Sequence, residues 1–118
     1  MKLKIAVATK GENGLEDWVS EVFGRTKTIT VIEMDDSKVN EVKTFDNPAL
    51  SYKYGAGPIL VKTLQDLGVN VVVASNFGPS VSEMLDGIGY RKFVVKAGTP
   101  VKDAIDYVRS NILNPKED

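Results

Sequence analysis

Two short and almost entirely apolar segments, far apart in the chain, constrain the fold most strongly. Residues 3–9 (Leu-Lys-Ile-Ala-Val-Ala-Thr) contain a single lysine, and residues 69–74 (Val-Asn-Val-Val-Val-Ala) contain a single asparagine. Apolar, β-favouring runs without polar alternation are typical of strands that are buried on both faces, as in sheets covered by helices. We therefore predict that both segments are adjacent central strands of one sheet.

The rest of the chain completes an alternating α/β pattern. Its apolar spacing predicts two hairpin strands, then helices alternating with one further strand: residues 28–34, 39–45, 58–67, 79–88, 93–95 and 100–113. A short helical turn is also expected within residues 15–23. The order β-β-β-α-β-α-β-α, with right-handed helical crossovers, predicts a three-layer α/β/α fold with a ribonuclease H-like motif. Its five-stranded mixed sheet should have strand 2 as the antiparallel strand.

Length and composition exclude several classes of protein. The 118 residues suit one domain over residues 1–113 with a polar tail over residues 114–118. Fifteen basic and sixteen acidic residues argue against a nucleic-acid partner. The chain has no histidine and no cysteine, which excludes histidine- and cysteine-dependent nucleophiles, zinc fingers, histidine-bound haem and cysteine-bound iron–sulfur clusters. No carboxylate lies on residues 5–9, so we expect no nuclease-like metal site and no enzymatic activity.

The location of the protein is also an expectation. Lysine interrupts the amino terminus too early for a signal peptide, and no run reaches the ~20 apolar residues of a membrane span. We expect a cytoplasmic protein without a membrane partner.

Four glycine-rich or polar loops should leave the sheet at one edge. Residues 10–14, 47–57, 75–80 and 97–100 each follow a strand that is predicted to run in the same direction. Ligands of open α/β sheets bind at this edge, here between strands one and four. Unpaired N–H groups at two helix starts, together with two cations, predict an anion site there. Its candidate residues are Lys10, Arg25, Gly55, Gly57, Asn76, Gly78 and Ser80.

Structural roles for these loop residues remain open alternatives. Gly55 and Gly57 can provide a tight entry to a helix, and Asn76 can cap the next helix. In Phe23-Gly24-Arg25, the phenylalanine can fill the core, the glycine can turn with positive φ, and Arg25 can pair with a carboxylate. The tyrosines at positions 52 and 54 lie in a long loop for which function and disorder are competing explanations.

Several of these segments together resemble one known family. The opening Lys-Ile-Ala-Val-Ala-Thr-Lys-Gly, Glu-Val-Phe-Gly-Arg at 21–25, Asp-Asn-Pro at 46–48, Gly-Ala-Gly at 55–57, Val-Val-Val-Ala-Ser-Asn-Phe-Gly-Pro at 71–79 and Ala-Gly-Thr-Pro-Val at 97–101 are similar to the dinitrogenase iron-molybdenum cofactor biosynthesis family. The resemblance implies a ribonuclease H-like domain and, for nitrogen-fixation members, binding or carriage of the iron-molybdenum cofactor or its precursor.

The family's ligand residues are not all retained here. Nitrogen-fixation members carry histidine directly before Phe-Gly-Arg and in the third loop, where this chain has Val22 and Tyr54. Valine offers no donor, and a phenol is a poor substitute for imidazole, so we expect no direct metal ligand. The resemblance therefore implies a non-enzymatic carrier that holds the iron-molybdenum cofactor, a related anionic cluster or an oxyanion by hydrogen bonds. The alternative is a domain that binds a protein partner or a phosphate-bearing ligand without metal.

Overall fold

The computed structural model describes residues 2–36, 38–52 and 55–113. Ser37, Tyr54 and the predicted tail 114–118 therefore lie outside the described residues. Within the described ranges the chain forms strands, α-helices and single 3-10 turns in this order: β1 (Lys2–Thr9), η1 (Gly14–Glu16), η2 (Phe23–Arg25), β2 (Thr28–Asp35), β3 (Lys38–Asp46), η3 (Pro48–Ser51), α1 (Ala56–Asp66), β4 (Val71–Ala74), α2 (Pro79–Gly87), β5 (Arg91–Val94) and α3 (Val101–Leu113).

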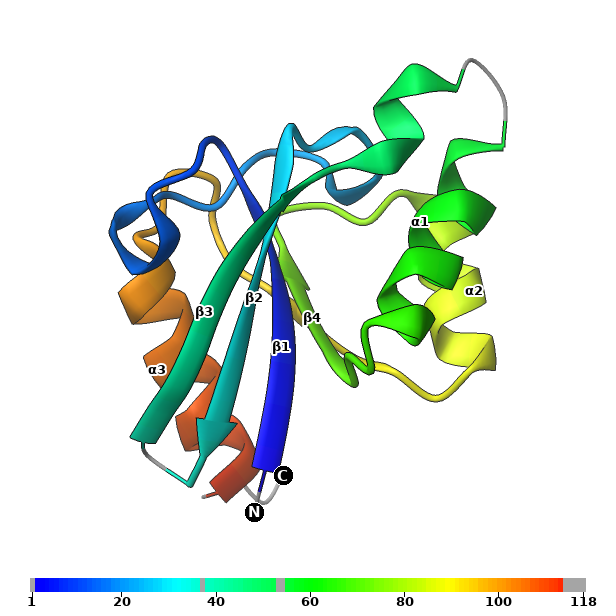
Figure 1. The fold of residues 1–118 in the computed structure, drawn as a ribbon. Helices are drawn as coiled ribbons and strands as arrows, with labels where there is room; N and C mark the ends of the chain where they lie inside the picture. The colour runs from blue at the N-terminus through cyan, green and yellow to red at the C-terminus, as the bar shows by residue number, and fades with distance from the viewer. Residues whose placement is uncertain (1, 37, 53–54, 114–118) are drawn as a thin grey trace.

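The strands form one mixed sheet in the order β3-β2-β1-β4-β5 (Figure 1). Strand β1 pairs in parallel with β4 and antiparallel with β2, which in turn pairs antiparallel with β3. Strand β5 adds in parallel to β4. Strand β2 therefore runs against the other four, and β1 and β4 lie side by side in the middle. The predicted fold class and the predicted position of the two apolar strands are confirmed.

Both faces of the sheet are covered by helices, which explains why β1 has so few polar residues. Helices α1 and α2 lie on one face and α3 lies on the other (Figure 1). Ala6 and Ala8 of β1 face α1 and α2, while Ile5 and Val7 belong to the core under α3. All four side chains are completely buried. None of the described helices is long and apolar enough to cross a membrane.

Two strands begin two residues away from the predicted start, for identifiable reasons. Strand β4 begins at Val71 rather than at residue 69, because the preceding residues close the end of α1. Gly68 has φ 75°, and the Val69 N–H donates to the Leu64 carbonyl oxygen at 3.1 Å. Strand β5 begins at Arg91 rather than at residue 93, since its ladder starts opposite Val71.

Candidate functional site

The carboxyl ends of the four parallel strands meet at one edge of the sheet, at the top of Figure 1. Residues 17–23 cross this edge. Val19 pairs with Thr9 at the end of β1, and Val22 pairs with Asn76 just after β4. The Phe23 N–H also donates to the Asn76 carbonyl oxygen at 2.8 Å. The chain itself therefore fills the expected crevice between strands one and four.

The short helical turn predicted within residues 15–23 is found only at the two ends of that range. These are η1, which ends at Glu16, and η2, which begins at Phe23, and the residues between them are not helical. Phe23 is completely buried and lies 5.3 Å from Phe77 between ring centroids, so its predicted core role is confirmed. Gly24 lies inside η2 and is not among the glycines with positive φ, so that prediction was wrong.

A basic depression lies on one side of the Val22–Asn76 pair. It has a volume of about 310 Å³ and is lined by residues of the crossing segment, by those just before β2 and by the residue that follows β1: Lys10, Ser20, Glu21, Val22, Arg25, Thr26 and Lys27. Three of these side chains are cationic and exposed, and Glu21 is the one carboxylate of the set. Lys10 and Arg25, predicted to converge, therefore line the same depression.

The cations of the basic depression are available to a ligand. Within the described part of the chain, Lys10, Arg25 and Lys27 make no side-chain ion pair, so the alternative in which Arg25 pairs with a carboxylate is wrong. Exposed cations keep their hydration until an anion arrives, and a guanidinium offers a bidentate fork to an oxyanion. This depression is suited to a small anion.

A buried hydroxyl cluster holds the wall of the basic depression in place. The Thr26 hydroxyl lies 2.7 Å from that of Ser20 and is within hydrogen-bond distance of the carbonyl oxygens of Thr9 (2.8 Å) and Thr28 (2.9 Å). Asn47 adds a side-chain N–H to the Thr26 carbonyl oxygen at 3.0 Å. Because these groups are buried, a fully bonded cluster fixes the backbone beside Arg25.

A second hollow, here called the α2 depression, lies on the other side of the Val22–Asn76 pair. It has a volume of about 430 Å³ and is lined by the chain after β4, the start of α2 and one side of β5: Ser75, Asn76, Phe77, Gly78, Pro79, Ser82, Lys92 and Val94. The Lys92 ammonium group is engaged, with the Asp86 carboxylate at 2.8 Å and the Ser82 hydroxyl at 2.5 Å. This hollow offers less free positive charge than the basic depression.

The chain is recognised by a family model described as "dinitrogenase iron-molybdenum cofactor", which matches residues 1–111. It belongs to that family. The likeness extends to an uncharacterized protein of Methanocaldococcus jannaschii, 25% identical over 81 residues, which are 69% of this chain and 67% of that protein. Members of this family are related to nitrogenase iron-molybdenum cofactor biosynthesis.

Two solved structures have the same fold. A Thermotoga protein provisionally named NifB is 30% identical with a TM-score of 0.69, covering 90% of this chain and 86% of that one. The orange protein of Desulfovibrio gigas, solved in its apo form, is 24% identical with a TM-score of 0.76, covering 94% of this chain and 87% of that one.

The other predicted residues of this family member do not gather at one site: two line the α2 depression, and three line neither depression. Asn76 and Gly78 line the α2 depression, where the Asn76 amide oxygen accepts the Gly78 N–H at 2.9 Å. Ser80 is exposed in the first turn of α2. Gly55 caps α1 with φ 75° and, like Gly57, lines neither depression among the described residues.

Gly57 has a packing role that its sequence context did not reveal. A Cβ atom there would lie 2.9 Å from Met84 Cε and 3.1 Å from Val81 Cγ2, so the glycine lets α1 approach α2 closely. Its membership of an anion site stays a prediction.

Sequence reasoning missed several residues that line the two depressions. Lys27 follows the Phe-Gly-Arg segment by two positions and could have been found from that proximity. Ser20 and Thr26 show no signal in the sequence, because their role depends on contacts with β1 and β2. Lys92 lies just before the strand predicted at residues 93–95, so the sequence did not mark it as a strand lysine that needs a polar partner.

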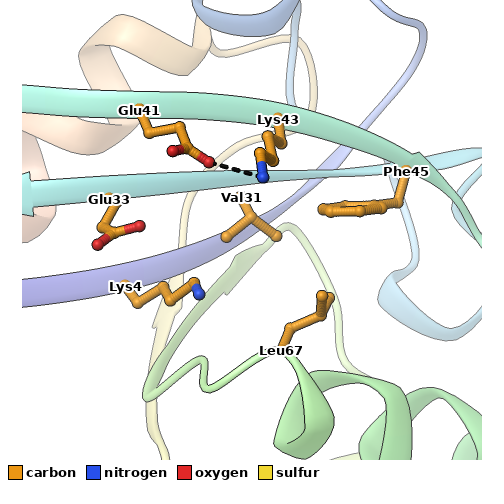
Figure 2. A pocket seen from close by; sticks show the side chains of 7 residues that line it. All are labelled: Lys4, Val31, Glu33, Glu41, Lys43, Phe45 and Leu67. Carbon is orange, nitrogen blue, oxygen red and sulfur yellow. Dashed lines mark ion pairs between the residues drawn. The ribbon is translucent and has the colours of Figure 1, made fainter.

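A third and smaller hollow lies on the sheet face, between β3 and the end of α1 (Figure 2). Its volume of about 70 Å³ suits one or two water molecules. Lys43 lies 2.9 Å from Glu41 at its rim, and the hydrogen bond and charge of Glu41 raise the pKa of Lys43 above its ordinary value. Among the described residues, no group of three or more acidic side chains is arranged to hold a metal ion.

Proposed function

We propose that this protein is a non-enzymatic binding or carrier domain that holds an anionic metal cluster or an oxyanion at the basic depression. The observation that carries the proposal is the convergence of Lys10, Arg25 and Lys27, three exposed cations without ion-pair partners in the described residues, around one hollow. Family membership supports the chemical class of the ligand, since the iron-molybdenum cofactor is the family's named subject.

The donor set determines how such a cargo would be held. With no histidine or cysteine in the chain, a cluster would be bound through its outer atoms rather than through bonds to metal. Guanidinium and ammonium groups donate hydrogen bonds to sulfide or oxo atoms, and their charge opposes that of the cluster. This mode of binding is reversible, as a carrier requires, and it is weakened by salt.

Arg25→Ala tests the proposal. Amide chemical shifts of the wild-type protein should move at residues 20–27 when molybdate or tetrathiomolybdate is added, and increasing sodium chloride should reverse the change. Removal of one charge-assisted, bidentate donor should weaken binding by about tenfold. Arg109→Ala is the matched control, because Arg109 lies on α3 and pairs there with Asp106.

The same titration distinguishes the alternatives. Equal affinity in wild type and Arg25→Ala would reject the basic depression as the site. Absence of any shift at millimolar anion, with both proteins folded, would favour a domain that binds a protein partner without an anion. Retention of tetrathiomolybdate but not molybdate after desalting would identify a sulfidic cargo.

A further inference from the structure

The outer edge of the sheet at β5 is open to a further strand. The Arg91 N–H donates to Asn70 and the Val95 N–H donates to Ala74, both toward the β4 side. Because N–H and C=O groups alternate direction along a strand, those of Lys92 and Val94 point away from β4. In the sheet formed by the described residues, β5 is a terminal strand, so these groups have no strand beside them.

Apolar surface surrounds this open edge. The Val94 side chain is 62% exposed and lines the α2 depression together with Phe77. On the opposite face of the sheet, Tyr107 of α3 is 47% exposed and packs against Phe93 edge-on, with 6.0 Å between ring centroids. An added strand would therefore find apolar contacts on both faces, in addition to backbone hydrogen bonds.

Among the described residues, the charges of β5 and the loop after it that make no ion pair are cationic. Residues 87–102 contain Arg91, Lys92, Lys96 and Lys102 and no acidic residue, although the whole chain has a net charge of −1. Lys92 and Lys102 are paired with Asp86 and Glu16. Arg91, which lies 5.9 Å from the Phe93 ring centroid, and Lys96 make no ion pair within the described residues.

The opposite edge of the sheet differs in this respect. Strand β3 carries both signs, from Lys38 to Asp46, and its Glu41 and Lys43 neutralise one another at 2.9 Å. Charges at sheet edges commonly prevent aggregation, and the mixed pattern of β3 suits that purpose. At the β5 edge the cations without ion pairs in the described residues, Arg91 and Lys96, repel cationic strands and attract acidic ones.

We propose that the β5 edge binds an extended segment of a partner protein, rich in acidic and apolar residues, by strand addition. Main-chain hydrogen bonds would provide affinity, and the cations and apolar side chains would select the sequence. A second copy of this chain is a poor occupant. An antiparallel pair centred on Val94 would place Lys92 of one copy opposite Lys96 of the other, and like charges there repel.

A peptide titration tests this proposal independently of the anion site. The probe is a short capped peptide of alternating glutamate and valine, and the control peptide has lysine in place of glutamate. With the glutamate peptide we expect amide shifts at Lys92, Val94 and Phe77, slower hydrogen exchange at Lys92 and Val94, and no change at Arg25. The lysine peptide should leave all of these signals unchanged.

Val94→Pro isolates the backbone contribution. It removes an N–H that points away from β4, so the ladder with β4 is retained and the peptide should bind about fivefold or more weakly. Val94→Thr keeps the N–H and the branched side chain and should bind almost as tightly as the wild type. If Val94→Pro does not fold, a probe N-methylated at alternate residues replaces it and should fail to bind the wild type.

Three results would overturn the proposal. The first is the absence of shifts at millimolar glutamate peptide, and the second is equal binding of the glutamate and lysine peptides. The third is concentration-dependent dimerisation of the free protein in sedimentation experiments that Val94→Pro abolishes, which would assign the edge to a second copy. Loss of anion binding in Arg25→Ala bears on none of these.

Discussion

Thr26→Val should destabilise the protein, because it removes a buried hydroxyl at almost constant volume. The Thr26 side chain is 2% exposed, and its hydroxyl contacts Ser20 and the carbonyl oxygens of Thr9 and Thr28. The carbonyl oxygens of Thr9 and Thr28 stay opposite one another in the β1–β2 ladder, and Ser20 lines the basic depression. The substitution would therefore remove the hydrogen bond to one of these carbonyl oxygens and the hydrogen bond with Ser20.

The expected cost follows from these two hydrogen bonds. A buried hydrogen bond contributes about 0.5–1.5 kcal/mol to the free energy of unfolding, so the loss of two costs about 1–3 kcal/mol. For a domain of this size, that corresponds to a lowering of the melting temperature by about 4–12 °C. Urea unfolding followed by circular dichroism, with the thermal midpoint as a second measurement, gives both quantities.

Thr63→Val is the matched control. The Thr63 hydroxyl donates to the Ile59 carbonyl oxygen at 2.9 Å on α1, but the residue is only partly buried and that carbonyl group also takes part in the helix. Its loss should change the free energy of unfolding by less than about 0.5 kcal/mol. Equal effects of the two substitutions would refute the view that burial makes the Thr26 hydroxyl cluster important.

Two further predictions concern single substitutions elsewhere. Gly78 has φ 75° and ψ 153°, so Gly78→Ala should lower the free energy of unfolding in urea by about 1–3 kcal/mol. Gly87 is at a helical position with no atom near an added Cβ, so Gly87→Ala should raise it by about 0.5–1 kcal/mol. A protein with Gly78→Ala that is more stable than one with Gly87→Ala would contradict this. Burial raises the pKa of Tyr90 above 10.0, so the unfolded chain loses this proton before the native state does, and stability falls as the pH rises above about 10. Tyr90→Phe should lessen that alkaline loss, and an unchanged pH profile would argue against it.

The fold could be predicted because its strongest signals are local. The apolar runs that became β1 and β4 have no polar alternation, and a strand with helices on both faces needs none. The crossing segment 17–23 could not be predicted in this way. Its backbone hydrogen bonds go to residues as distant as Asn76 and Thr99, and spacing along the chain carries no record of such partners.

The candidate site could be predicted only in part, because only some of its residues stand out locally in the sequence. Charged residues beside glycine-rich turns, such as Lys10 and Arg25, stand out in the sequence and do share a depression. A glycine, in contrast, looks the same in the sequence whether its N–H binds a ligand or its missing side chain lets a neighbouring helix pack closely. Gly57 illustrates this ambiguity, since only the positions of Val81 and Met84 reveal its contact with α2.

The crossing segment makes the wall of the basic depression part of the core. Phe23 is completely buried against Phe77, while Arg25, two residues later, is exposed to solvent. An anion that binds Arg25 would therefore hold η2 in the geometry that already places Phe23 between the sheet and α1. Ligands that bind only the native state stabilise it by mass action, so tetrathiomolybdate should raise the melting temperature of the wild type. The rise should be smaller in Arg25→Ala. An equal rise in both proteins would show that the ligand does not stabilise the protein through Arg25 and η2.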